Sequence, residues 1–523
     1  MVSAAPASQL VLIIAAGLLA ARAGRHFRVP EAIPLLITGY LLGSDLLGFL
    51  KPEEIGINLD LLALLAVPII LFYDGLKTDA RSLRENAFAV LSITTLAVVV
   101  TVAGIAFFSH LFLGLSWEGS LLLGAILAST DPASIIPVLR KLHIKKKISA
   151  VLEAETALND AMALTLFTII LGLAAGQQLS LREGVTQFLY TAVSSSVLGA
   201  VVGSAFYELF KRLKVEGDLV FASFVVLLTA YGAAEFFKAS SVITIVFAAL
   251  IFRAFVQSVA VNASNRHHTL SVWEDLNFIA ISAIFLILGA QVQVRQATPY
   301  LLVGLLIALL YMLLVRPLTV LVSLFFDKGF SFKEKLAISW LGGPRGVVSA
   351  ALAGIVLSKA SQGIVPQAEA DAIFNITVIV IAATVGITSL TASSAAKRLL
   401  RLREDTLRDE YKRLSTELKT LMIASRRFRE QWKEGSVSTK IYDALNKEMH
   451  RQMRSIEKRL EQIAARAPRL ESTEIAMKAR EIILNQVNAL ENAYENKEIP
   501  EKDYLQLSSK LRAQADALAE IEG

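Results

Sequence analysis

Three observations predict an all-α polytopic membrane protein with about 13 transmembrane helices and a helical cytoplasmic tail. Hydrophobic residues make up 54% of the 523 positions, and the mean hydropathy is +0.55, values that water-soluble chains rarely reach. Long apolar segments recur through the first 400 residues. Charged residues concentrate beyond them, with 46 of the 98 in residues 401–523. We therefore expect a transmembrane domain over 1–400 and a cytoplasmic helical domain over 401–523.

Thirteen segments are long and apolar enough to cross a bilayer, whose hydrocarbon core is about 30 Å thick. We place them at residues 8–22, 31–50, 58–76, 86–114, 117–139, 148–176, 184–210, 218–237, 240–258, 272–294, 299–326, 335–358 and 371–396.

The number of Lys and Arg residues alternates from one connecting loop to the next. The loops after the odd-numbered segments hold 19 of them, and those after the even-numbered segments hold 5. Because positively charged loops stay in the cytoplasm, we expect the N-terminus outside the plasma membrane and the tail inside. The uncharged N-terminus predicts a retained anchor rather than a cleaved secretory signal.

Composition excludes several classes of function. The chain has no cysteine, so neither a disulfide nor a thiolate metal site is expected. It shows no glycine-rich phosphate loop, dinucleotide fingerprint or metal-ligand cluster, and no cofactor is predicted. The 24 basic and 22 acidic residues of the tail are interspersed, which argues against nucleic-acid binding.

Helix-type periodicity and few glycines predict a helical tail. Breaks at Gly435, Pro468 and Pro500 divide it into four expected helices at 403–433, 438–466, 472–496 and 501–521. Apolar side chains are expected to pack onto another helix, within the tail or across a dimer, at Leu414, Leu418, Leu421 and Ile423. A bundle that tunes assembly or stability is favoured over a ligand-sensing domain.

Two aspartates are expected near the middle of the membrane. Asp131 lies nine residues before Arg140, about 14 Å from the cytoplasmic edge, and Asp160 lies twelve residues after Ile148, about 18 Å from it. One ionised acid at the bilayer centre costs at least about 2.5 kcal/mol, so Glu155 and Asp160, two acids within six residues of the apolar stretch 150–176, indicate a functional site. The alternatives are a helix that stops short of the membrane and a satisfied buried ion pair.

Helix breakers accompany the acids. Pro132 biases Asp131 away from helical geometry, so the segment 117–139 is expected to be interrupted there. An interrupted helix exposes carbonyl groups that can coordinate a cation, whereas the alternative is a simple proline kink. The segment 335–358 carries a second interruption, Gly-Gly-Pro-Arg-Gly at 342–346. Both interrupted segments hold the fifth position of a six-segment half, which is typical of a transporter binding site.

The segment 148–176 supplies further oxygen atoms. Thr156 and Asp160 lie four residues apart on one stripe of this expected helix. With Thr130 and Asp131 they offer the hydroxyl and carboxylate oxygens that alkali cations prefer, and protons compete for the carboxylates.

The neighbouring stripe carries Glu155 and Asn159. Arg345 lies at nearly the same depth as Glu155, and a permanently charged guanidinium inside a membrane needs a carboxylate partner. We therefore expect a Glu155–Arg345 ion pair.

At these positions the chain resembles the electroneutral sodium/proton antiporters of the NhaP and NHE type, over most of residues 1–400. The shared motifs are STDPAS at 129–134, ETxxND at 155–160, WExL at 273–276 followed by Phe285 and Gly289, and GGPRG at 342–346. The resemblance implies two inverted six-helix repeats with crossing broken helices beside Asp160. It also implies a homodimer with a dimerisation domain and a mobile core of six helices.

The resemblance also implies roles for individual residues. Asp160 would bind the cation and the proton alternately, and the residues that would complete its site are Thr130, Asp131 and Thr156. The residues that would hold the core together are Asn159, Glu155 and Arg345. Asn159 precedes Asp160 where electrogenic relatives have a second aspartate, which implies exchange of one cation for one proton.

Some positions depart from the family pattern. Tyr73 stands where relatives commonly have an acid in the third segment, and Asp74 follows one place later. Asp74 is therefore a candidate accessory residue. Ser134 of the STDPAS motif is a second candidate. The remaining departures are Thr156 for the usual serine, Pro344 for leucine and Ile281 for asparagine.

The predicted function is secondary active exchange of a monovalent cation for H⁺, with Na⁺ first and K⁺ or Li⁺ as alternatives, and no enzyme activity. A cation channel or uniporter also needs acids at this depth, although no repeated carbonyl filter occurs. An intramembrane enzyme could use Asp131 and Asp160 as an aspartyl dyad, although Arg345 and the paired interruptions argue against it.

Overall fold

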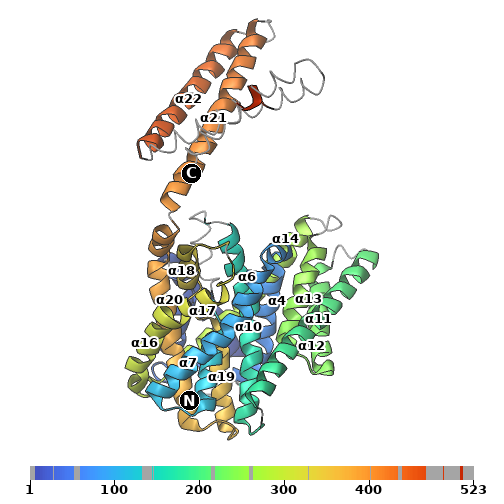
Figure 1. The fold of residues 1–523 in the computed structure, drawn as a ribbon, viewed down its shortest axis with the longest axis vertical. Coiled ribbons are helices and arrows are strands. Elements are labelled where there is room, and N and C mark those ends of the chain that lie inside the picture. The colour runs from blue at the N-terminus through green and yellow to red at the C-terminus, as the bar shows by residue number, and fades with distance from the viewer. Residues whose placement is uncertain are drawn as a thin grey trace. The chain divides into compact units, whose positions relative to one another are not determined.

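The computed structural model describes residues 6–27, 29–51, 59–131, 144, 146–178, 180–213, 218–257, 263–327, 329–400, 402–433, 439–466, 487 and 507–509. All elements within these residues are helical, which confirms the predicted all-α class (Figure 1). The chain divides into two units, Met1–Leu400 and Arg401–Gly523, and each is described by itself.

Apolar helices build the first unit. In chain order they are α1 (Pro6–Phe27), α2 (Ala32–Leu42), α4 (Leu59–Lys77), α5 (Ala80–Glu85), α6 (Ala87–Leu91), the π-helical turn η1 (Ser92–Leu96), α7 (Ala97–Leu113), α8 (Trp117–Ala128), α10 (Lys146–Ala174), α11 (Leu181–Leu213), α12 (Leu219–Phe237), α13 (Ser241–Val256), α14 (Ala263–Gln291), α15 (Val294–Ala297), the 3₁₀ turn η3 (Thr298–Tyr300), α16 (Leu301–Leu310), the π-helical turn η4 (Tyr311–Val315), α17 (Arg316–Ser323), α18 (Phe332–Leu341), α19 (Val347–Ser361) and α20 (Gln367–Leu399).

Every expected membrane segment overlaps at least one of these helices. Within the described part of the chain, eight helices are long and apolar enough to cross a membrane, and shorter apolar helices accompany them. The total of thirteen spans and their arrangement as inverted repeats therefore stay predictions.

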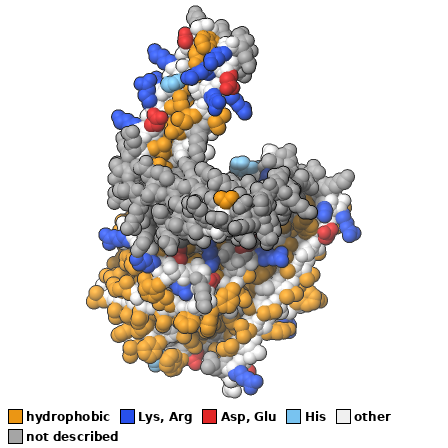
Figure 2. All heavy atoms as spheres, turned by 45° about the horizontal axis from the view of Figure 1, so that its top comes forward, with side chains coloured by type: hydrophobic (Ala, Val, Ile, Leu, Met, Phe, Trp, Pro, Cys, Tyr) orange, Lys and Arg blue, Asp and Glu red, His pale blue; other side chains and the backbone are white. Residues whose placement is uncertain are grey.

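The flank of the first unit is apolar. Figure 2 shows hydrophobic side chains spread over this flank, with Lys, Arg, Asp and Glu gathered toward its ends. Large apolar side chains such as Leu390, 86% exposed, belong to this surface. Apolar surface on this scale is rare on water-soluble monomers but suits contact with lipid.

Both segments with a predicted interruption leave the helical conformation there. α8 ends at Ala128, and residues 129–131 are not helical. α18 ends at Leu341, and α19 begins at Val347 after five non-helical residues. Pro132, which was expected to interrupt the first segment, and the candidate accessory residue Ser134 lie outside the described residues.

Two uninterrupted helices, α10 and α20, pack against the helices that border the interruptions. The uninterrupted α10 packs against α8 and α19, and α20 also contacts both of these helices (Figure 1). Side chains on α10 therefore face both interruptions.

In the second unit, α21 (Leu402–Lys433) and α22 (Thr439–Arg466) match the first two expected helices and pack together. Their shared core contains Leu414, Ile456, Tyr411, Leu418, Leu421 and Leu460. Ile423 is 58% exposed and lies outside this core, so of its two expected packing partners only a helix across a dimer stays a prediction. It lies two residues after Leu421, about 200° around the helix from it. The third and fourth expected tail helices lie outside the described residues except for Val487 and 507–509.

Candidate functional site

The two interruptions meet inside the first unit. The backbone N–H of Asp131 donates to the carbonyl oxygen of Pro344 at 2.9 Å, so each interruption satisfies a polar group of the other. Gly346 permits this approach, because a Cβ there would collide with the Cβ of Asp131. Non-helical backbone is tolerated at membrane depth only when protein or water satisfies it in this way.

The carbonyl groups that end α8 also have partners. Nη1 of Arg345 donates to the carbonyl of Ser129 at 2.8 Å and to that of Ala128 at 3.4 Å. Nδ2 of Asn159 donates to the Ala128 carbonyl at 2.8 Å. These donors replace the helical N–H groups that the interruption removes. The carbonyl of Ala128 therefore already accepts two hydrogen bonds, and the expectation that the interruption offers carbonyl groups to a cation stays a prediction.

Asp160 lies at the crossing and is only 5% exposed. Its Oδ1 accepts the hydroxyl of Ser129 at 2.6 Å, and the backbone amide of Thr130 also hydrogen-bonds to its carboxylate. Asp160 forms no salt bridge with any residue that the structure describes. Its hydrogen-bond partners are therefore neutral donors from the interruption.

Two further acids lie near Asp160. Asp74 on α4 and Asp131 are close enough to interact electrostatically with Asp160 and with each other. Both are partly exposed, whereas Asp160 is buried. Carboxylates gathered in this way repel one another unless a proton or a cation is added. The candidate accessory residue Asp74 is thus brought to the site, although it follows Tyr73 by one place.

The two candidate threonines direct their hydroxyl protons away from Asp160. Thr130 donates to Oε1 of Glu155 at 3.4 Å and accepts Nδ2 of Asn159 at 2.9 Å. Thr156 donates to a carbonyl of its own helix, that of Leu152, at 3.0 Å. Both hydroxyl oxygens keep lone pairs, so their expected contact with a cation stays a prediction.

Glu155 is fully buried and paired, but its partner is Arg316. Oε1 of Glu155 lies 2.6 Å from Nη2 of Arg316, whose Nε reaches the carbonyl of Ser339 at 3.4 Å. A Cβ at Gly342 would collide with this guanidinium, so the interruption also makes room for the pair. The predicted Glu155–Arg345 pair is therefore wrong, because equal depth in the membrane does not determine which helix faces α10.

Arg345 is fully buried and lies over an aromatic ring. Its guanidinium carbon is 3.7 Å from the centroid of the Tyr311 ring. Its backbone N–H donates to Oγ1 of Thr384 on α20 at 3.2 Å. Nε and Nη2 have no hydrogen-bond partner among the described residues.

Three residues of this region were not predicted as site residues, namely Arg316, Ser129 and Tyr311. Arg316 lies within the apolar segment 299–326, where a charge is as costly as that of Glu155, so the signal was present in the sequence. Ser129 belongs to a recognised motif, but its contact with Asp160 joins two helices and leaves no spacing pattern.

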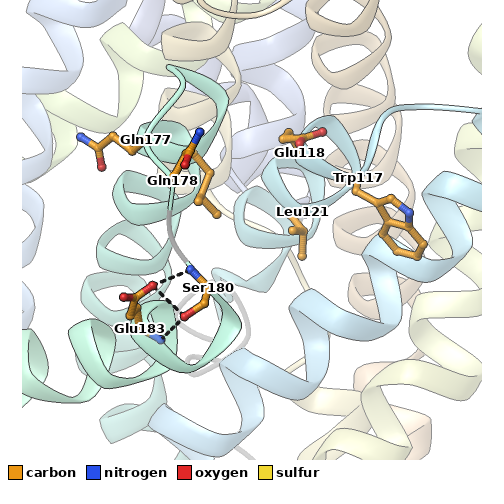
Figure 3. Close-up of a pocket in the computed structure, with 8 residues that line it drawn as sticks. Trp117, Glu118, Leu121, Gln177, Gln178, Ser180 and Glu183 are labelled. Carbon is orange, nitrogen blue, oxygen red and sulfur yellow. Dashed lines mark hydrogen bonds between the residues drawn. The ribbon is translucent and has the colours of Figure 1, made fainter.

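A separate cavity of about 640 Å³ opens near the other end of α8. Figure 3 shows Trp117 and Glu118 on one side of it and Ser180 hydrogen-bonded to Glu183 on the other. Trp117 begins α8 and Ala128 ends it, which separates the two ends by about 16 Å along the helix axis. This cavity is therefore distinct from the crossing.

The chain is similar to known proteins over most of its first unit. Residues 10–398 match the family described as sodium/hydrogen exchanger, transmembrane. The Na⁺/H⁺ antiporter ApNhaP of Aphanothece halophytica is 30% identical over 62% of this chain and 62% of its own length. The low-affinity Na⁺/H⁺ antiporter NhaS1 of Synechocystis sp. is 28% identical over 80% of this chain and 79% of its own length. The K⁺/H⁺ antiporter NhaP of Alkalimonas amylolytica is 31% identical over 66% of this chain and 58% of its own length.

The solved structure of the sodium proton antiporter MjNhaP1 from Methanocaldococcus jannaschii at pH 8 has a similar fold. The match has a TM-score of 0.67 at 25% identity and covers 76% of this chain and 98% of that one. The chain spans less than two thirds of the length of ApNhaP and of the Alkalimonas protein. The family match covers most of the first unit and confirms the resemblance, so this chain belongs to the sodium/hydrogen exchanger family.

Proposed function

We propose that this chain exchanges a monovalent cation for H⁺ by alternating access at Asp160. The observation that carries the proposal is a buried carboxylate, without a cationic partner among the described residues, at the crossing of two interrupted helices. The names of the relatives, which include both Na⁺/H⁺ and K⁺/H⁺ antiporters, support this class of activity.

The exchange follows from competition for the same oxygen atoms. A protonated Asp160 is neutral and has little affinity for a cation, whereas a bound cation excludes the proton. Asp131, Thr130 and Thr156 are proposed to complete the cation site, and Asp74 to act as an accessory acid at its partly exposed side. Each cycle would then carry a cation in one direction and a proton in the other.

We propose a stoichiometry of one cation for one proton. The side chain beside Asp160 is the neutral amide of Asn159, which binds the Ala128 carbonyl and the Thr130 hydroxyl. If Asp160 alone changes its occupant, the charge of the carrier is the same in both loaded states. An imposed membrane potential should therefore leave the exchange rate in proteoliposomes unchanged.

The cellular arrangement is also proposed. The charge pattern of the loops supports a plasma membrane protein with its N-terminus outside and its tail in the cytoplasm. A homodimer is the proposed assembly. Exchange of this kind would contribute to pH homeostasis.

Everted membrane vesicles provide the test. Adding Na⁺, K⁺ or Li⁺ to respiring vesicles should dequench a pH-sensitive dye, and Asp160→Ala should abolish this response. The same series identifies the preferred cation. Normal exchange by Asp160→Ala, or cation current without proton movement, would contradict the proposal, and the second result would indicate a channel.

For the tail we propose a structural role, because α21 and α22 share an apolar core. Truncation after Arg401 should lower stability or assembly while exchange persists. A changed pH or cation dependence at unchanged assembly would instead indicate regulation.

A further inference from the structure

We propose that Tyr311 is a positioning residue of the exchange site, which acts through Arg345 on Ser129 and Asp160. The inference rests on the exchange function proposed above and concerns a residue outside the cation site itself. Its basis is the contact between the ring of Tyr311 and the guanidinium of Arg345.

The position of Tyr311 depends on the π-helical turn η4. Tyr311 begins this turn, and Arg316 directly follows it. In an α-helix, residues five apart diverge by about 140° around the axis. A π-helical turn closes with i→i+5 hydrogen bonds and so brings such residues toward one face. Both side chains are accordingly buried, with Arg316 paired to Glu155 and Tyr311 beneath Arg345.

The ring of Tyr311 contacts a guanidinium that keeps two unpaired donors. Glu155 is already paired with Arg316, and Nε and Nη2 of Arg345 have no partner among the described residues. A buried donor without an acceptor is costly, whereas the face of an aromatic ring attracts a guanidinium. Tyr311 thus holds a charge that lacks a carboxylate of its own.

The restrained arginine connects directly to the exchange site. Its Nη1 donates to the carbonyl of Ser129, and the hydroxyl of Ser129 donates to Asp160. The charge of Arg345 also interacts electrostatically with Asp160. If the ring were removed, the guanidinium could turn its unpaired donors toward Asp160 and form a charge-assisted hydrogen bond. Arg345 would then compete with the transported cation for the same carboxylate.

Substitutions of Tyr311 distinguish the contribution of the aromatic face from those of the hydroxyl and of side-chain volume. The Tyr311 hydroxyl has no partner among the described residues, so Tyr311→Phe should keep the apparent KM for the cation within about twofold of the wild type. Tyr311→Met fills similar space without an aromatic face, and Tyr311→Leu is a second variant of this kind. Both should raise the apparent KM about tenfold, with a smaller change in maximal rate.

The matched control is Phe188→Leu on α11, which also removes a buried ring. It should leave the apparent KM unchanged, although it lowers stability. Rates are measured in proteoliposomes at fixed pH and are normalised to folded protein from size-exclusion chromatography.

A wild-type KM in folded Tyr311→Met or Tyr311→Leu would overturn the inference, as would an equal rise in Tyr311→Phe. An equal rise in the Phe188→Leu control would also overturn it, because the effect would then be a general loss of packing. Failure of the exchange function would look different, since the wild type itself would show no exchange.

Discussion

Glu155 and Asp160 are two buried carboxylates five residues apart on α10, and they differ in their partners. Glu155 is paired with Arg316 and accepts the hydroxyl of Thr130. Asp160 accepts the hydroxyl of Ser129 and a backbone amide, and none of its hydrogen-bond donors is charged. Burial alone therefore does not identify the exchanging acid. The partner does, because a carboxylate that neutralises an arginine cannot release it without leaving a buried charge.

Replacing Asp160 should have the largest effect. Asp160→Asn keeps the shape of the side chain but removes the group that alternates between a proton and a cation, so exchange should disappear. The variant should fold as well as the wild type, since it removes a buried charge. Dye dequenching in everted vesicles and a thermal melt measure the two effects. Residual cation-dependent exchange would place the exchanging acid elsewhere, with Asp131 and Asp74 as the next candidates.

Replacing Glu155 should act on stability instead. Glu155→Gln leaves Arg316 buried without a counter-ion and should lower the free energy of unfolding by about 3–5 kcal/mol. The double variant Glu155→Leu/Arg316→Met replaces the whole pair by apolar side chains and should recover most of this loss. Unfolding of detergent-purified protein measures both. A single variant as stable as the wild type would show that the pair contributes little.

Two glycines of the second interruption sharpen the contrast. Gly346→Ala places a Cβ against Asp131 and should displace the crossing, lowering the exchange rate about 100-fold. Gly342→Ala places a Cβ against Arg316 and should reduce stability more than the rate measured per folded molecule. Vesicle exchange measures the rate, and thermal melting measures stability. A larger rate loss in Gly342→Ala than in Gly346→Ala would contradict the assignment of exchange to Asp160 and of stability to Glu155.

The smallest effect is expected for Ser129→Ala. The hydroxyl of Ser129 donates to Asp160 and so favours its ionised form, and a hydrogen bond to a charged group contributes about 1.5–3 kcal/mol. Without it the proton competes more strongly, so the pH of half-maximal exchange should rise by about one to two units. The pH profile at fixed cation concentration checks this shift. A profile moved to lower pH would be incompatible with a hydroxyl that stabilises the carboxylate.

Much of the fold was predictable because it depends on local rules. Apolar length located the helices of the first unit, and the Gly-Gly-Pro-Arg-Gly run located the interruption between α18 and α19. The family motifs predicted the crossing beside Asp160, and the hydrogen bond from Asp131 to Pro344 confirms that the interruptions meet.

The pairing of side chains between helices was less predictable. Arg316 and Arg345 both offered a guanidinium at a suitable depth, and only the packing of α17 against its neighbours decides which one reaches Glu155. The π-helical turn before Arg316 changes the phase of its helix, which periodicity in the sequence does not reveal. The same limit applies to Ser129, whose contact with Asp160 depends on the backbone after α8.

Cation-induced proton release from purified protein tests the central claim most directly. In weakly buffered detergent solution, adding the transported cation should release about one proton per chain from the wild type, as expected when a cation displaces the proton of one carboxylate. Asp160→Asn should release none, whereas folded Glu155→Gln should still release its proton. Release that persists in Asp160→Asn, or that is lost in folded Glu155→Gln, would contradict the assignment of exchange to Asp160.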